Sequence, residues 1–265
     1  MRQPGNEIWD EASLRDPHAV ADKRARVRAM FESIAGRYDL LNRVLSLGLD
    51  RRWRRRAAAL AAVKAGERVL DVCCGSGDLA REFVRAEPGL EMVVGVDFSE
   101  GMLAQARGKG PIRVAGEGAG GSDRYKQLSI HWLCGDAERL GFAGESFDCV
   151  SCAFGVRNLG SVSAGLGEMR RVLVPGGRLV ILEFSVPENR WLRRLYGLYF
   201  RFVLPAVGSM MSGDRTKAYH YLPASVRRFD TAGQFVTRMH EAGFSEVETF
   251  RLSGSAVLCL RARKR

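Results

Sequence analysis

Short apolar runs alternate with amphipathic stretches from Glu67 onward, and this alternation predicts the fold. Runs rich in β-branched residues are typical of buried strands, whereas apolar positions spaced three and four apart are typical of helices. The expected strands cover 68–73, 91–98, 128–136, 146–154, 177–185, 246–252 and 256–262, and the expected helices cover 77–86, 99–108, 162–173 and 231–244. This order predicts an α/β fold with a doubly wound, mostly parallel seven-stranded sheet. The last two strands follow each other closely, which would make the sheet mixed at one edge.

Two segments fall outside this alternation. Residues 20–64 precede the first strand and are predicted to be helical, and residues 190–229 are predicted to be helix and loop. The Gly-rich stretch from Gly108 to Asp123 predicts a surface loop. We expect a single domain over 1–265, with a helical cap at 20–64, a core at 66–187, a helical insertion at 188–230 and a last helix with the edge strands at 231–265.

Composition places the chain among globular proteins. Of its 265 residues, 46% are hydrophobic and 27% are charged, which argues against a disordered chain. No apolar run approaches the roughly 18 residues of a membrane-spanning helix. The N-terminus has no apolar segment typical of a secretory signal, so the expected location is the cytoplasm.

The six cysteines are too few for a disulfide scaffold. Cys149 and Cys152 form a C-x-x-C motif, but it lies within an expected strand, where residues three apart point to opposite faces. We therefore expect buried thiols there rather than a metal or redox pair. No other cluster of His, Cys and acidic residues has metal-ligand spacing, so no metal is expected.

Glycines and carboxylates gather where the expected strands end. Gly75 and Gly77 follow the first strand and precede a helix, so the backbone there can approach a ligand closely. Asp71 ends the first strand, Asp97 closes the second and Asp136 closes the third. A carboxylate at the end of the second strand can accept hydrogen bonds from both hydroxyls of a ribose. One such Asp is as typical of a turn or a helix cap, whereas three together indicate a nucleoside-binding site.

The glycine loop also fits a dinucleotide-binding fingerprint, because Gly75, Gly77 and Ala80 form a G-x-G-x-x-A pattern. Two carboxylates near the loop, Asp71 and Asp78, would repel a pyrophosphate. The same carboxylates favour a cofactor with a cationic end, such as S-adenosylmethionine with its amino and sulfonium groups. The sequence therefore favours S-adenosylmethionine over a nicotinamide dinucleotide.

Further elements resemble the ubiquinone/menaquinone biosynthesis C-methyltransferases, over about residues 28–262. The stretch Tyr38-Asp39-Leu40-Leu41-Asn42, with Trp53 further on, resembles their N-terminal signature. Residues 171–185 resemble their second signature, and residues 154–158 resemble their F-G-x-R-N element. Ala153 stands where the family has a small polar residue. Several separate elements thus recur in the order that the family shows.

The resemblance implies a class I, Rossmann-like methyltransferase that uses S-adenosylmethionine. The implied reaction methylates a ring carbon of a polyprenylated quinol, with demethylmenaquinol to menaquinol expected first. The matching step on 2-methoxy-6-polyprenyl-1,4-benzoquinol, toward ubiquinone, is the alternative. A small-molecule or nucleic-acid methyltransferase and a non-enzymatic scaffold are weaker alternatives. The candidate cofactor-binding residues are Asp71, Gly75, Ser76, Gly77, Asp97, Phe98, Asp136, Ala137 and Ala153.

Three residues are candidates for the catalytic step. Methylation of a hydroquinone carbon requires orientation of two reactants and loss of a hydroxyl proton, and a fixed cation would stabilise the phenolate. Arg157 is the candidate cation, Asn158 the candidate partner of a ring oxygen, and Tyr38 the candidate aromatic over the ring. Loop capping is the alternative for Arg157 and Asn158, and packing within the cap is the alternative for Tyr38. His220 could act as a base, but a structural role is favoured and the base stays unassigned.

The net charge of +11 is unevenly distributed. Residues 1–65 hold 14 basic and 8 acidic residues, residues 66–187 hold 13 and 16, and residues 188–265 hold 14 and 6. The basic excess therefore lies in the two regions expected to cover the substrate. An apolar stripe from Trp191 to Val203 is typical of a helix packed on the core, or of an interfacial helix that receives a prenyl tail. We expect peripheral contact with an anionic membrane surface at the inner membrane face and no nucleic-acid partner, and a homodimer is left open.

Overall fold

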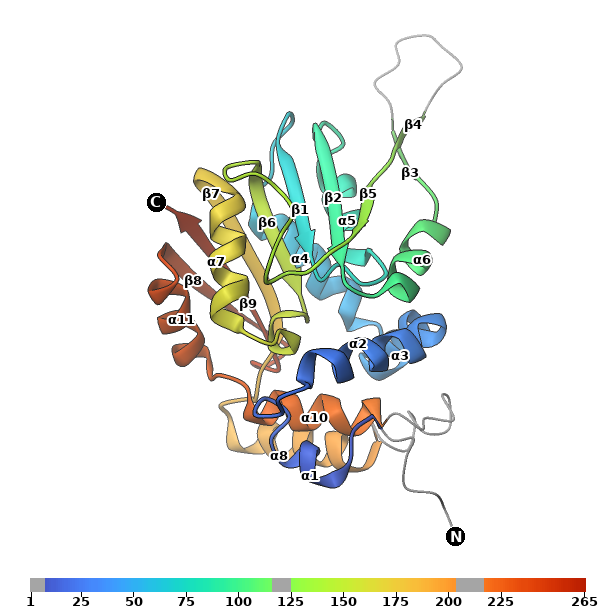
Figure 1. Cartoon of the computed structure of the whole chain (residues 1–265), viewed down its shortest axis with the longest axis vertical. Helices are drawn as coiled ribbons and strands as arrows, with labels where there is room; N and C mark the ends of the chain where they lie inside the picture. The colour runs from blue at the N-terminus through green and yellow to red at the C-terminus, as the bar shows by residue number, and fades with distance from the viewer. Residues whose placement is uncertain (1–7, 116–124, 204–216) are drawn as a thin grey trace.

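The computed structural model describes residues 8–115, 125–203 and 217–265. The strands of the central sheet are β1 (Arg68–Val72), β2 (Met92–Asp97), β5 (His131–Cys134), β6 (Phe147–Ala153), β7 (Leu173–Phe184), β8 (Phe244–Leu252) and β9 (Val257–Lys264). They lie side by side in the order β5-β2-β1-β6-β7-β9-β8 (Figure 1). The first five are parallel, whereas β9 is antiparallel to both β7 and β8. The predicted mostly parallel sheet with a mixed edge is confirmed.

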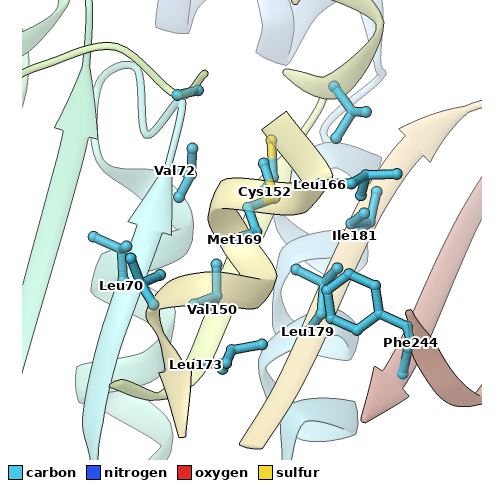
Figure 2. Packing of buried hydrophobic residues seen from close by; sticks show 14 of the residues in the cluster. Leu70, Val72, Val150, Cys152, Leu166, Met169, Leu173, Leu179, Ile181 and Phe244 are labelled. Atoms are coloured by element: carbon cyan, nitrogen blue, oxygen red, sulfur yellow. The ribbon is translucent and has the colours of Figure 1, made fainter. Parts of the chain in front are cut away.

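Helices cover both faces of this sheet (Figure 1). On one face, α4 (Leu49–Ala61) and α5 (Asp78–Ala86) share a core with strand residues such as Val69 and Val180. On the other face, α7 (Val162–Val172) and α11 (Ala232–Glu241) share a core with the next residues along the same strands. Figure 2 shows this second core, in which α7 lies over Leu70, Val150 and Leu179. Alternate side chains along each strand therefore point to opposite faces of the sheet and pack into two separate cores.

The C-x-x-C motif follows the same rule. Cys149 belongs to the core under α4 and α5, whereas Cys152 belongs to the core under α7. Both side chains are fully buried, and burial raises the pKa of the Cys149 thiol to about 12. The prediction of two buried thiols on opposite faces is confirmed.

Apart from α4, the helical segments outside the alternation gather with the N-terminal α1 at the carboxyl ends of the parallel strands (Figure 1). They are α1 (Glu11–Arg15), α2 (Lys23–Ile34), the 3₁₀ turn η1 (Ala35–Arg37), α3 (Tyr38–Leu45), α8 (Arg190–Leu198), the π-helical turn η3 (Tyr199–Val203) and α10 (Ala218–Arg228). A third apolar core joins the two segments, and in it the rings of Trp9 and Tyr221 stack with their centroids 4.4 Å apart. Segments far apart in sequence thus form one layer beside the ends of the strands.

One element differs from its prediction. The stretch expected to be a loop from Gly108 contains β3 (Ile112–Ala115), which pairs with β4 (Tyr125–Leu128) in a separate antiparallel ladder after α6 (Glu100–Gly108). The prediction of a loop is therefore wrong for residues 112–115, which form a strand because they pair with residues 125–128. Residues 116–123 of the predicted loop lie outside the described residues. None of the described helices is both long and apolar enough to cross a membrane.

Candidate active site

A cavity of about 640 Å³ lies at the carboxyl ends of β1, β2, β5 and β6. The strand order reverses between β1 and β6, and ligands of open α/β sheets bind at such a point. Of the nine residues predicted to bind the cofactor, those that line this cavity are Gly75, Asp97, Phe98, Asp136, Ala137 and Ala153.

Asp97 is held rigidly at the end of β2. Its Oδ2 accepts a hydrogen bond from the backbone N–H of Gly75 at 2.8 Å, and its Oδ1 accepts one from the N–H of Ser99 at 2.9 Å. Burial raises the pKa of this carboxyl to about 6, while the backbone hydrogen bonds oppose the shift. A carboxylate fixed in this way is pre-organised to accept hydroxyls of a bound ribose.

Asp136 lies after β5 and pairs with a residue that the sequence did not single out. Arg24 of α2 forms an ion pair with its Oδ2, and the N–H of Glu138 donates to its Oδ1 at 3.0 Å. Arg24 also lines the cavity, so α2 contributes a wall and a charge to it. No local pattern identifies Arg24 among the many basic residues of the N-terminal region.

The other three predicted cofactor-binding residues lie behind the cavity wall. Asp71 is 1% exposed and accepts hydrogen bonds from Ser151 Oγ at 2.7 Å and from the N–H of Ala80 at 3.2 Å. Burial raises the pKa of Asp71 to about 7. Ser76 donates to Asp39 Oδ1 at 2.5 Å. These hydrogen bonds hold the glycine loop in place from the side away from the cavity. That any of the three residues contacts the cofactor directly stays a prediction.

Gly77 has a packing role that the sequence did not indicate. It precedes α5 with a φ of +79°, and a Cβ built on it would lie 2.2 Å from the indole of Trp132. Gly95 in β2 faces the same ring, where a Cβ would lie 2.4 Å from it. Both glycines therefore make room for Trp132 on β5, whereas Gly75, with a φ of +55°, lines the cavity itself.

Two residues in the cavity wall have a strained backbone. Cys73 follows β1 with a φ of 53°, and Phe154 follows β6 with a φ of 57°. Both occupy the left-handed region that non-glycine residues rarely adopt, and both line the cavity. Backbone strain of this kind is concentrated at functional sites, so it supports the ends of β1 and β6 as part of the binding site.

A second cavity of about 1000 Å³ lies next to the first, among the helices. Phe31, Tyr38 and Phe154 line both cavities, so the two spaces meet at these rings. The walls of the second are mainly apolar and aromatic, and they include Met30, Ile34, Leu41, Leu45, Trp53, Phe184, Tyr196, Tyr199, Ala218 and Leu222. This cavity is suited to a hydrophobic ligand.

Arg157 places a buried charge in this apolar wall. The turn η2 (Val156–Asn158) carries it, and its Nη1 forms an ion pair with Glu183 Oε1 at 2.6 Å. Burial alone would lower the pKa of Arg157, but the Glu183 carboxylate raises it and preserves the cation. Its Nε has no hydrogen-bond partner among the described residues. Glu183, which fixes this cation, lies within the second family signature, but the sequence alone indicated no role for it.

Asn158 and Tyr38, the other catalytic candidates, lie around the junction of the two cavities. Asn158 lines the first cavity, donates to the carbonyl of Phe154 at 3.1 Å and accepts from the Tyr221 hydroxyl at 2.8 Å. Tyr38 meets Phe31 edge to face, and burial raises the pKa of its phenol. The structure thus brings Arg157, Asn158 and Tyr38 together. It also gives both Arg157 and Asn158 the loop-capping contacts that were their alternative, because Arg157 Nη1 donates to the same Phe154 carbonyl at 2.7 Å. His220 is exposed on α10 and lines neither cavity, so its position does not support the hypothesis of a base.

Lys23 of α2 clamps the loop that carries Arg157. Its Nζ donates to the carbonyl of Arg157 at 2.9 Å and to that of Leu159 at 2.5 Å, and it lies 3.2 Å from His18 Nδ1. Lys23 is 4% exposed, and burial lowers its pKa to about 8. Sequence reasoning missed this residue because a buried lysine inside a basic helix looks like a solvated one.

The chain matches the ubiE/COQ5 methyltransferase family over residues 19–264. It belongs to this family. A demethylmenaquinone methyltransferase of Deinococcus radiodurans is 49% identical over 223 residues, which cover 84% of this chain and 86% of that relative. A ubiquinone/menaquinone biosynthesis C-methyltransferase of Geobacter sulfurreducens is 45% identical over 229 residues, which cover 86% and 84%. The family resemblance inferred from the motifs is confirmed.

Solved structures show that this methyltransferase has the class I fold. A SAM-dependent methyltransferase of Thermotoga maritima superposes with a TM-score of 0.59 at 19% identity, covering 90% of this chain and all of that one. The phosphoethanolamine N-methyltransferase 2 of Haemonchus contortus, solved with S-adenosylmethionine, gives a TM-score of 0.53 at 17% identity, covering 80% and 52%. The predicted Rossmann-like architecture is confirmed.

S-adenosylmethionine is the cofactor of this methyltransferase, and the first cavity fits it. Asp97 offers a fixed carboxylate for a ribose, and Gly75 has no side chain that would keep the cofactor away from the loop backbone. Three carboxylates in the wall, Asp97, Asp136 and Glu138, suit a cofactor that carries a positive charge. Asp71 and Asp78, on which the sequence argument against a pyrophosphate rested, do not line this cavity, and Asp78 forms ion pairs with Lys109 and Arg54.

Proposed function

We propose that this methyltransferase methylates a ring carbon of a lipophilic polyprenylated quinol, converting demethylmenaquinol to menaquinol. The observation that carries the proposal is the apolar cavity that meets the cofactor cavity at Phe31, Tyr38 and Phe154. A quinol ring placed at these side chains would have its tail among the apolar residues of α2, α3 and α10. The name of the Deinococcus radiodurans relative, demethylmenaquinone methyltransferase, supports the same substrate.

The chain's own residues supply orientation and charge, while S-adenosylmethionine supplies an electrophilic methyl group. The ring carbon becomes nucleophilic when a neighbouring hydroxyl loses its proton, so a nearby cation favours the phenolate. Arg157 provides that cation in the mainly apolar wall, where Glu183 holds its guanidinium group in place.

A benzoquinol is the second candidate substrate. The Geobacter sulfurreducens relative is named for both ubiquinone and menaquinone biosynthesis, and the two quinols differ in the fused ring beside the reacting one. A nucleic-acid substrate is less consistent with the structure, because a cavity lined mainly by aliphatic and aromatic side chains suits an apolar molecule.

The proposal is tested by supplying S-adenosylmethionine with reduced demethylmenaquinone or with the reduced benzoquinone precursor, and by measuring the product mass. We expect a methylated naphthoquinol. Methylation of the benzoquinol alone would select the second candidate, and methylation of neither quinol would overturn the proposal.

A matched pair of arginine variants tests the role of Arg157. Arg178 is also paired with a glutamate and also has an Nε without a partner among the described residues, but it lines neither of these cavities. We expect Arg157→Lys to lower kcat by about tenfold or more with little change in the Kd for S-adenosylmethionine. Arg178→Lys should leave kcat unchanged. An unchanged kcat in Arg157→Lys would exclude the catalytic role, and a change confined to cofactor affinity would indicate a role in shaping the loop.

A further inference from the structure

The helix α8 presents an unusual outer face. Trp191 is 76% exposed, Leu195 is 63% exposed and Leu198 is 48% exposed. Their spacing of four and three residues places them on one side of the helix. None of the nine residues of α8 is buried. Large apolar side chains that cluster on a surface mark a site where something else binds.

The inner face of α8 belongs to the proposed quinol site. Tyr196 lines the apolar cavity, and Tyr199, in the next turn, lines it too and donates from its hydroxyl to the carbonyl of Leu45 at 2.5 Å. One helix therefore separates the apolar cavity from the exposed stripe. An amphiphilic substrate with a long tail would have only this helix between its binding site and the surface.

A groove between α8 and α10 adds positive charge beside the stripe. Its volume is about 890 Å³, and Arg193, Arg194 and Arg227 line it together with apolar residues such as Pro223 and Val226. All three arginines are exposed, and within the described part of the chain no ion pair involves them. Unpaired guanidinium groups over an apolar floor can hold a phosphate above a hydrocarbon chain.

We propose that α8 and the α8–α10 groove form the surface by which the enzyme docks on a membrane that contains anionic phospholipid. In this arrangement Trp191 and Leu195 enter the interface, and Arg193 and Arg194 bind lipid phosphates. The proposal deepens the proposed function, because docking there brings the wall of the quinol cavity to the surface where such a substrate resides. A second copy of the chain is a poorer occupant, since the same guanidinium groups would face each other.

The first experiment measures sedimentation of the full chain with vesicles. Vesicles of phosphatidylcholine alone are compared with vesicles that contain about one quarter phosphatidylglycerol. We expect Arg193→Glu/Arg194→Glu to lower the partition coefficient for the anionic vesicles by at least about tenfold. The control is Arg113→Glu/Arg265→Glu, which makes the same change in net charge. Arg113 lies in β3, at the far end of the molecule from α8, and Arg265 is the C-terminal residue (Figure 1).

The second comparison tests the apolar stripe at constant charge. Leu195→Ser should lower vesicle binding several-fold, whereas Leu133→Ser, at a 45% exposed leucine on β5, should not. Equal loss in both double charge variants, or equal binding of the wild type to neutral and anionic vesicles, would overturn the proposal. Binding of a DNA or RNA duplex that Arg193→Glu/Arg194→Glu abolishes, without vesicle binding by the wild type, would replace it with a nucleic-acid surface.

A parallel assay separates this proposal from the proposed function. Turnover is measured on a quinol with a short tail, supplied in solution without vesicles. Because Leu195 and Arg193 line neither the cofactor cavity nor the apolar cavity, we expect normal turnover in their variants. Lack of quinol methylation by the wild type would contradict the proposed function and leave the vesicle result to stand by itself.

Discussion

The close contact between Gly77 and Trp132 makes a quantitative prediction for Gly77→Ala. The substitution has two separate costs, since Gly77 has a φ of +79° and its new Cβ would lie 2.2 Å from the indole. The left-handed conformation costs an L-residue roughly 1–2 kcal/mol. Overpacking of a filled site costs a further amount of about 1–3 kcal/mol. We therefore expect the free energy of unfolding to fall by roughly 2–5 kcal/mol.

Gly176→Ala is the matched control for the first cost. Gly176 has a φ of +76°, but nothing lies within 4 Å of a Cβ built on it. Its variant should lose only about 1–2 kcal/mol. The difference between the two variants isolates the steric overlap with Trp132.

A double-mutant cycle with Trp132→Phe checks the cause. Phenylalanine lacks the outer atoms of the indole, so Gly77→Ala should cost no more than Gly176→Ala in that background. Unfolding in urea, followed by circular dichroism, supplies the free energies, and calorimetry supplies the affinity for S-adenosylmethionine. We expect Gly77→Ala also to weaken S-adenosylmethionine binding, because the overlap with Trp132 displaces the loop that carries Gly75, and we expect the double variant to regain most of that affinity. Equal costs for Gly77→Ala and Gly176→Ala, or a loss of affinity unaffected by Trp132→Phe, would refute the packing argument.

Further predictions concern buried charges. Glu183→Gln leaves the Arg157 cation without its 2.6 Å partner and should lower the free energy of unfolding by about 3–5 kcal/mol. Glu145→Gln, whose carboxylate is 57% exposed, should cost below about 1 kcal/mol in the same urea assay. Asp71 keeps its proton in the folded state up to a pKa of about 7, against 3.8 when unfolded, so its contribution to stability falls as pH rises between these values. Asp71→Asn should lack this decline when unfolding is measured from about pH 4 to pH 7. Lys23 has a folded pKa of about 8, below 10.5, so stability should rise with pH across that interval, and Lys23→Met should abolish the rise.

Much of the fold followed from local pattern. The strands β1, β2, β6 and β7 are apolar and bounded by turns, so periodicity and glycine placement were enough to predict them. The strand β3 was missed because it sits beside glycines and exists only through pairing with β4. A strand of four residues is too short to show a clear period, and its partner lies beyond a Gly-rich stretch.

The site was predicted in part for a similar reason. Asp97 and Asp136 end strands, and a parallel sheet brings the carboxyl ends of its strands to one edge, so local position was sufficient. Asp71 and Gly77 also end or follow a strand, but the structure turns them toward Ser151 and Trp132. Sequence position places a residue at an edge, whereas only packing decides which side of the loop its side chain faces.

The sequence by itself determined the fold class, the family and the chemical character of the cofactor site, because these depend on periodicity, on motif order and on residue type at strand ends. Only the tertiary structure decided that Glu183 neutralises Arg157, that Lys23 clamps the same loop and that α8 separates the apolar cavity from an exposed stripe. These relations join residues 26 and 134 positions apart in the chain, or two faces of one helix. Their energies come from burial and from hydrogen-bond geometry, which exist only once the chain has folded.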